Sequence, residues 1–433
     1  MAFEQQGSLA TKSIELRQKL NALLEARDSN AAIQSEQIIF DRLTSSELTL
    51  LNADVIVTAN EVNQRHGTGV LINKIFGSCA NIFSIRAHNH YDAEHDFGDL
   101  SAVISVQELS RKNVFSNVLQ AFAQCTPRQV ICIPFDPDEI LIAIAIKELF
   151  DVPLCMYIMD DNNIYAKGIP DPLMQEALTK SSLRLAISPE LQQAYQHKYN
   201  LKFWLLPPVV TGELIHTDIG TVPKPRNPKT GIIVGNIWGQ RWLDLLRQTV
   251  KGSGITIHWY CNAASKSRWL QFDPAELAQD GIFFRDPLPE PELAEKLKEY
   301  AFAVLPSGVF DSTETENNQA VAKLSLPTKV PFITATSNTP ILVLGSRESA
   351  AARFVERFNL GIICDYHPNS FQQAIEQITG SEMQTLLRQN AQTIAPSFSD
   401  VGIPQWIFQS LQRGEPIDHR FEQFVSPLES TEY

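Results

Sequence analysis

Short apolar runs alternate with helix-forming stretches along most of the 433-residue chain, and this pattern constrains its fold more than any other feature. Predicted strands of four to six residues, built on these apolar runs, lie at 54–59, 130–134, 154–158, 231–234 and 302–305. Their length suits buried strands better than helices. Strands and helices alternating at this spacing predict mainly parallel sheets, whose loops gather at the carboxyl edge, where ligands usually bind.

A proline-rich segment, TVPKPRNPKT, separates two regions that each show this alternation. Proline-rich polar sequence between periodic regions is typical of a linker. We therefore predict an α/β protein with two Rossmann-like, doubly wound domains and an N-terminal helical extension. The expected divisions are the extension at 1–52, an N-terminal domain at 53–208, a linker at 209–230, a C-terminal domain at 231–400, and a C-terminal helix and tail at 401–433 that return toward the N-terminal domain.

The N-terminal extension carries a leucine stripe at helical spacing. Leu16, Leu20, Leu23 and Leu24 lie on one face of a predicted helix at 8–27, and a second helix is predicted at 34–43. An apolar stripe of this kind packs on a neighbouring domain or forms a contact with a partner, such as a second copy of the chain.

Composition excludes some partners and favours others. The formal net charge is −13, which argues against nucleic acid because phosphate contacts require a basic face. A small anion remains compatible, since amides at helix N-termini bind phosphates locally. The six cysteines are scattered and predicted to be buried thiols. Neither a signal peptide nor an apolar membrane span is found, so we expect a cytoplasmic protein, with peripheral membrane contact left open.

The first candidate site is an HGTG loop that follows the predicted strand at 54–59. Gly67, Thr68 and Gly69 are expected to turn the backbone tightly and aim amides at an anion, a phosphate or an acceptor. His66 beside them adds a group suited to proton transfer near neutral pH. The alternative is a glycine turn needed only for packing.

Asp160 and Asp161 form the second candidate site, directly after the predicted strand at 154–158. Adjacent carboxylates at a strand end are costly unless they are solvated, hydrogen-bonded or near a cation. We interpret one of them as the group that orients or deprotonates a substrate hydroxyl. A solvated loop with a capping aspartate is the alternative.

A polar cluster follows the predicted strand at 82–87 and contains His88, His90, Asp92, Glu94, His95 and Asp96. Its spacing matches no zinc or calcium pattern, so a solvated loop is favoured over a metal site. A lid over the binding site is a further alternative.

The carboxyl edge of the second predicted sheet provides the fourth candidate site. Gly235 ends a strand, and Arg241 lies at the start of the next helix. Lys329, with the hydroxyls of Ser325 and Thr328, suits a diphosphate, and Ser346 is interpreted as the cap of a helix. Their convergence at successive strand ends favours anion binding over separate structural roles.

Several segments, taken in order, resemble GT-B glycosyltransferases. The proline-rich hinge, the glycine loop and SLPTK are similar to that family, and YIMDDNN, LAISPELQQAY and YNLKFWLLPP resemble a bacterial group with an MDDW-type segment. Asn162 stands where that group has tryptophan. Many retaining members also carry a pair of glutamates whose positions here hold Leu324 and Phe332.

This resemblance implies that the C-terminal domain binds a nucleotide-sugar and the N-terminal domain an acceptor, a glycan or lipid-linked molecule. Lys329 and Arg241 would stabilise the leaving diphosphate without a metal or other cofactor, and Asp160 or Asp161 would act on the reacting hydroxyl. Two other functions remain open. One is a non-catalytic scaffold or binding subunit, and the other is a sugar-nucleotide epimerase or hydrolase of the same fold.

Overall fold

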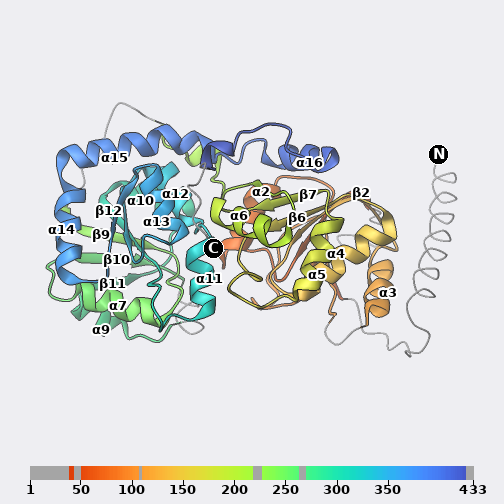
Figure 1. The fold of residues 1–433 in the computed structure, drawn as a ribbon, viewed down its shortest axis with the longest axis horizontal. Coiled ribbons are helices and arrows are strands. Elements are labelled where there is room, and N and C mark those ends of the chain that lie inside the picture. Colours follow the sequence, from red (N-terminus) through yellow and green to blue (C-terminus); the bar gives the residue numbers. More distant parts are fainter. Residues whose placement is uncertain (1–38, 43–49, 107–109, 218–226, 263–269, 426–433) are drawn as a thin grey trace.

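The computed structural model describes residues 39–42, 50–106, 110–217, 227–262 and 270–425. These residues form two α/β halves, each built on its own sheet and lying side by side (Figure 1). We call them the N-terminal half, around the sheet of strands β1 to β8, and the C-terminal half, around the sheet of strands β9 to β14. The predicted fold class is confirmed for these residues.

The sheet of the N-terminal half has eight strands in the order β1-β4-β3-β2-β5-β6-β7-β8. All neighbouring strands pair in parallel except β1, which is antiparallel to β4. The bounds are β1 Ile39–Arg42, β2 Leu50–Thr58, β3 Ile82–Arg86, β4 Leu100–Val103, β5 Cys125–Ile133, β6 Leu154–Ile158, β7 Leu183–Ala186 and β8 Trp204–Leu205.

The sheet of the C-terminal half has six parallel strands in the order β11-β10-β9-β12-β13-β14. The bounds are β9 Asn227–Val234, β10 Thr256–Tyr260, β11 Ile282–Arg285, β12 Tyr300–Pro306, β13 Ile341–Leu344 and β14 Gly361–Cys364. The central strand is β2 in the first sheet and β9 in the second, and the strand order reverses beside each of them. The carboxyl ends of the strands there form the crevice where ligands bind in doubly wound folds.

Helices connect the strands and cover the sheets. Those of the N-terminal half are α2 Gly67–Phe76, α3 Arg111–Ala121, α4 Pro137–Phe150, α5 Asp171–Lys180 and α6 Pro189–Tyr199. Those that follow are α7 Gln240–Val250, α9 Pro274–Gln279, α10 Glu290–Lys298, α11 Glu316–Leu324, α12 Lys329–Ser337, α13 Ala350–Arg357, α14 Pro368–Thr379, α15 Ser381–Ile394 and α16 Ile403–Arg413. Short 3-10 turns lie at Gly212–Leu214, Ala395–Phe398 and Glu422–Phe424.

The end of the chain crosses from the second half to the first. Helices α15 and α16 run along one side of the molecule, and α16 lies over the N-terminal half (Figure 1). Phe408 of α16 stacks on Phe76 of α2 with ring centroids 5.9 Å apart, and Gln412 Nε2 donates to Gln129 Oε1 at 3.0 Å. These contacts attach the end of the chain to the N-terminal half.

The N-terminal extension needs a correction. The predicted helix at 34–43 is a strand over its described part, because Ile39–Arg42 pairs with β4. The predicted helix at 8–27 lies outside the described residues, as do residues 218–226 of the predicted linker. Within the described part of the chain, no helix combines the length and the apolar character that crossing a bilayer requires.

Candidate functional site

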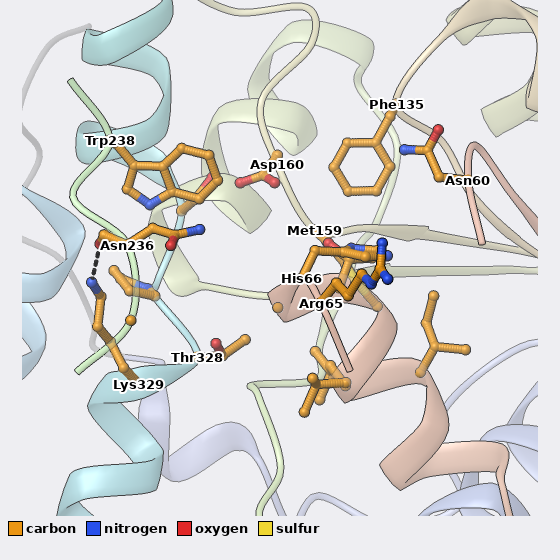
Figure 2. A pocket seen from close by; sticks show the side chains of 18 of the residues that line it. Asn60, Arg65, His66, Phe135, Met159, Asp160, Asn236, Trp238, Thr328 and Lys329 are labelled. Atoms are coloured by element: carbon orange, nitrogen blue, oxygen red, sulfur yellow. Dashed lines mark hydrogen bonds between the residues drawn. The ribbon is translucent and has the colours of Figure 1, made fainter. Parts of the chain in front are cut away.

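A cleft of about 1160 Å³ lies between the two halves. The N-terminal half lines it with residues that directly follow β2, β5 and β6, and the C-terminal half with residues that follow β9 and β10 and with the segment 325–329 (Figure 2). The carboxyl edges of both sheets therefore open into one space. Its lining includes nine of the twelve predicted site residues: His66, Gly67, Thr68, Asp160, Asp161, Gly235, Ser325, Thr328 and Lys329.

Helix α2 starts at the cleft and is capped by His66. The His66 Nδ1 accepts from the Gly69 amide at 3.2 Å, and its Nε2 lies 2.7 Å from the Glu61 carbonyl. The ring also stacks on Tyr91, with centroids 4.6 Å apart. Both ring nitrogens are thus engaged within the protein, so the geometry corrects the prediction of His66 as an acid–base group and makes it a helix cap.

The two glycines of the HGTG loop serve different purposes. A β-carbon at Gly69 would lie 2.6 Å from the Asn63 carbonyl oxygen, so Gly69 is required for packing and does not line the cleft. Gly67 and Thr68 do line it. Their amides stand in the first turn of α2, where backbone N–H groups have no intrahelical acceptor and favour an anion.

Helix α12 starts on the opposite wall, immediately after Thr328. Its first residue, Lys329, lines the cleft, as do Ser325 and Thr328. A β-carbon built on Gly67 would lie 3.4 Å from Thr328 Oγ1. The N-termini of α2 and α12, one from each half, therefore meet across the cleft, and their dipoles place partial positive charge on both walls.

Lys329 supplies a full positive charge beside this point. Its Nζ donates to the Asn236 carbonyl at 2.6 Å (Figure 2). Burial lowers the pKa of Lys329 to about 8. A lysine desolvated in this way gains more than an exposed one from an anionic ligand, because water no longer screens the pair.

Asp160 lies at the carboxyl end of β6, and its carboxylate points into the pocket (Figure 2). Burial raises its pKa to about 6, the nearby Ser325 hydroxyl opposes that rise, and the charge of Asp161 adds to it. A carboxylate with a pKa near neutrality is suited to taking a proton from a hydroxyl. Both halves therefore influence the pKa of Asp160, since Ser325 belongs to the C-terminal half.

The Asp161 carboxylate is hydrogen-bonded to the backbone of the loop that follows it. Oδ1 accepts from the amides of Asn163 and Ile164 at 2.9 and 2.7 Å, and Oδ2 accepts from Tyr165 at 2.7 Å and Ala166 at 3.4 Å. The side chain is only 4% exposed. The structure therefore corrects the prediction for Asp161, which organises the loop at 162–166 by satisfying its backbone.

Arg241 and Ser346 lie outside the cleft lining. The Arg241 guanidinium contacts Asp311 at 2.5 Å and Glu314 at 3.3 Å, so intramolecular carboxylates occupy it. The cap of α13 is Ser349, whose Oγ accepts from the Ala352 amide, and Ser346 instead accepts from Glu348 in the preceding turn. The predictions for these two residues are corrected accordingly.

Gly235 takes a conformation that only glycine adopts freely. Its φ is +71°, and it lines the cleft between β9 and the turn that carries Asn236 and Trp238. A side chain here would strain the backbone, because the left-handed region is unfavourable for L residues with a β-carbon. The strand end can therefore turn sharply and bring Asn236 to Lys329.

Sequence reasoning missed several residues that line the cleft. Phe135 follows β5, and Trp238, 43% exposed, follows β9 on the facing wall (Figure 2). Glu61 follows β2, and its buried carboxylate accepts from the amides of His90, Tyr91 and Ala93 at 2.8 to 2.9 Å. Although burial raises the Glu61 pKa, these amides outweigh it and lower the pKa overall. Phe135, Glu61 and Trp238 each lie in the loop that follows a strand, and this position is the signal that could have identified them.

The polar cluster at 88–96 is a structured loop. Besides the three amides held by Glu61, the His95 Nδ1 accepts from the Val62 amide at 3.0 Å, and Arg65 pairs with Asp92 at 2.8 Å. The predicted solvated loop is therefore fastened to the segment at 61–65. His90, Tyr91 and Asp92 extend the cleft wall beyond that segment.

Comparisons with solved structures identify the fold. HepE of Anabaena, solved in complex with UDP, is 14% identical over 83% of this chain and 100% of its own, with a TM-score of 0.56. The chain has the GT-B fold. A UDP-forming α,α-trehalose-phosphate synthase of Burkholderia xenovorans, solved with glucose-6-phosphate, is 9% identical over 83% of this chain and 100% of its own, with a TM-score of 0.53. MurG of Acinetobacter baumannii is 10% identical over 83% of this chain and 99% of its own, with a TM-score of 0.50.

The GT-B arrangement was the fold expected from the sequence resemblance, and it is confirmed. No protein-family model matches the chain, and no curated protein sequence does. Phe332 is buried in α12 with Lys74 Nζ 5.4 Å from its ring centroid, so it packs there without offering a hydrogen-bond acceptor.

Proposed function

We propose that this protein is a glycosyltransferase that moves a sugar from a nucleotide-sugar donor to a glycan or lipid-linked acceptor. The observation that carries this proposal is the meeting of the α2 and α12 N-termini beside Lys329 in one cleft between two Rossmann-like halves. Backbone amides, two helix dipoles and one ammonium group suit a diphosphate. HepE, which shares the fold, was solved with UDP, and this supports a nucleotide donor.

In this proposal the C-terminal half binds the donor. The first turn of α12, with Ser325, Thr328 and Lys329, holds the diphosphate, and Gly67 and Thr68 approach it from the other wall. The charge that develops on the leaving nucleotide diphosphate is then offset by Lys329 and the two helix N-termini, without a metal at that position. Asn236 orients Lys329 through its carbonyl.

The N-terminal half presents the acceptor to the donor. Asp160 accepts the proton of the reacting hydroxyl, because its carboxylate is the titratable group that enters the cleft with a pKa near neutrality. Phe135 and Trp238 lie on opposite walls near it and provide apolar faces against which sugar rings pack (Figure 2). Two halves that close on their substrates exclude water and limit hydrolysis of the donor.

The test combines binding with turnover. Calorimetric titration with UDP- and GDP-sugars should give binding to at least one donor, and Lys329→Met should weaken it. Donor should be consumed only when a suitable glycan or lipid-linked acceptor is added. Absence of binding to every donor would favour a scaffold, and consumption of donor alone would favour an epimerase or hydrolase.

A further inference from the structure

A second group of polar side chains lies beside the cleft, apart from the proposed donor site. His88 follows β3, and Asp136 and Glu139 stand at the start of α4. One ligand atom from each of these three residues lies within 4.8 Å of the others. Asp136 is exposed and lines the cleft, whereas His88 is half-buried and Glu139 is fully buried.

Only one of the two carboxylate oxygens of Glu139 has hydrogen-bond partners among the described residues. Its Oε2 accepts from the amides of Phe135 at 3.1 Å and Asp136 at 2.7 Å, which caps α4. Its Oε1 is buried and has no hydrogen-bond partner among the described residues. A buried carboxylate oxygen without a partner is costly, so the atom calls for a group that the chain itself does not provide.

The surroundings of Glu139 are strongly negative. Asp136 and Asp138 flank it, and the His88 imidazole lies beside them, with Nε2 3.2 Å from Asp138 Oδ2. Three carboxyl groups therefore share one imidazole, and a cation would offset the excess charge.

The neighbouring contacts also suit a metal. Asp138 fixes the orientation of the His88 ring, as carboxylates commonly do for imidazoles that bind metals. One imidazole and two carboxylates form a mixed nitrogen–oxygen set. Such a set favours transition metals that accept imidazole, such as Zn²⁺ or Co²⁺, over Mg²⁺ and Ca²⁺, which prefer oxygen ligands alone.

We propose that His88, Asp136 and Glu139 bind one divalent transition-metal cation. The site belongs to the wall of the cleft formed by the N-terminal half, where Asp136 is exposed, and Lys329 and the α12 N-terminus belong to the other half. It does not depend on the proposed transferase activity. Three protein ligands leave room for water or a substrate oxygen to complete the coordination.

The experiment measures metal binding directly. The full-length protein is stripped with a chelator and titrated with Zn²⁺ by calorimetry, and the visible spectrum is recorded after Co²⁺ is added. We expect about one equivalent of Zn²⁺, with affinity at least about tenfold lower in His88→Gln and in Glu139→Gln. Excess Mg²⁺ should not displace the Zn²⁺.

His419→Gln is the matched control. His419 Nδ1 lies 2.8 Å from Glu422 on the surface, so this exposed pair represents adventitious binding by a histidine and a carboxylate. Its loss should leave the Zn²⁺ affinity and the Co²⁺ spectrum unchanged. Equal affinity in the wild type, His88→Gln and Glu139→Gln, or no binding by the wild type, would overturn the proposal.

Folding of the variants is checked by thermal melts. Glutamine at 139 retains an oxygen that can accept from the capping amides, so α4 should keep its start. If Glu139→Gln nevertheless unfolds, His88→Gln decides the outcome, because His88 is partly exposed and lies outside the helix. Unchanged Zn²⁺ affinity in His88→Gln would then overturn the site.

Discussion

Gly67 and Thr68 begin one helix, Lys329 begins another, and the two helices meet where a β-carbon on Gly67 would lie 3.4 Å from Thr328 Oγ1. Gly67 belongs to the N-terminal half and Thr328 to the C-terminal half. The space above this contact is where two positive helix ends face a common ligand. The relationship arises from the tertiary fold, since more than 200 residues separate the two positions in the sequence.

Gly67→Val should weaken donor binding about tenfold, which corresponds to about 1.4 kcal/mol, because the added methyl groups extend toward Thr328 and the anion space. Calorimetry with the preferred nucleotide-sugar measures the effect. Gly67→Ala is the control, since its β-carbon makes ordinary contact and should be tolerated. In a double-mutant cycle, Thr328→Ala should partly restore binding to Gly67→Val; strict additivity would contradict the steric explanation.

Lys329→Met should weaken the binding free energy of the donor, or raise the activation free energy of turnover, by about 2–4 kcal/mol. The substitution removes a desolvated positive charge that would otherwise contact the diphosphate. Methionine keeps much of the side-chain volume, so the fold should persist. Lys323→Met is the matched control, since Lys323 lies on α11 over the rings of Tyr165 and Phe310 and not in the cleft lining. Equal donor affinity and rate in the two variants would remove Lys329 from the site.

Neighbouring aspartates should respond in opposite ways to the same substitution. Asp160→Asn should lower kcat strongly with little change in melting temperature, since its carboxylate enters the cleft. Asp161→Asn should instead lower the free energy of unfolding by about 1–3 kcal/mol, because an amide group cannot accept from all the backbone amides that Asp161 holds. Activity assays and thermal melts on both variants test the assignment, and a reversed pattern would refute it.

The sequence placed several of the predicted residues at strand ends, but it did not show the partners of their side chains. Asp160 and Asp161 were correctly placed at a strand end, yet only tertiary structure shows which carboxylate reaches the amides at 163–166. Arg241 meets Asp311 and Glu314, which lie 70 and 73 residues away in the chain. Ser346 and Ser349 are both good caps by type, and the backbone angles of the turn decide between them.

The sheets were predictable where periodicity was strong. The apolar runs of β6 and β13 are fully buried, as their composition indicates. β9 begins at Asn227, four residues before its apolar run, because the polar segment Asn227–Thr230 is held by pairing of Asn227 with Tyr300 of β12. The four-residue edge strand β1 is too short to show a period, and its antiparallel partner β4 lies about 60 residues further along the chain.

Activity should depend on pH as a bell-shaped curve in kcat/KM for the donor, because two groups of the free protein have shifted pKa values. The pKa of Asp160 is raised to about 6, so below that pH the carboxyl keeps its proton and cannot accept another. The pKa of Lys329 is lowered to about 8, so above that pH the ammonium loses the charge that holds the diphosphate. Rates should therefore rise through pH 6 and fall through pH 8. The measurement is the initial rate in buffers of constant ionic strength. Asp160→Asn should remove the acidic limb from the pH profile of the residual activity, and Lys329→Met should remove the basic limb. A wild-type profile that stays flat from pH 5 to 9 would contradict both assignments.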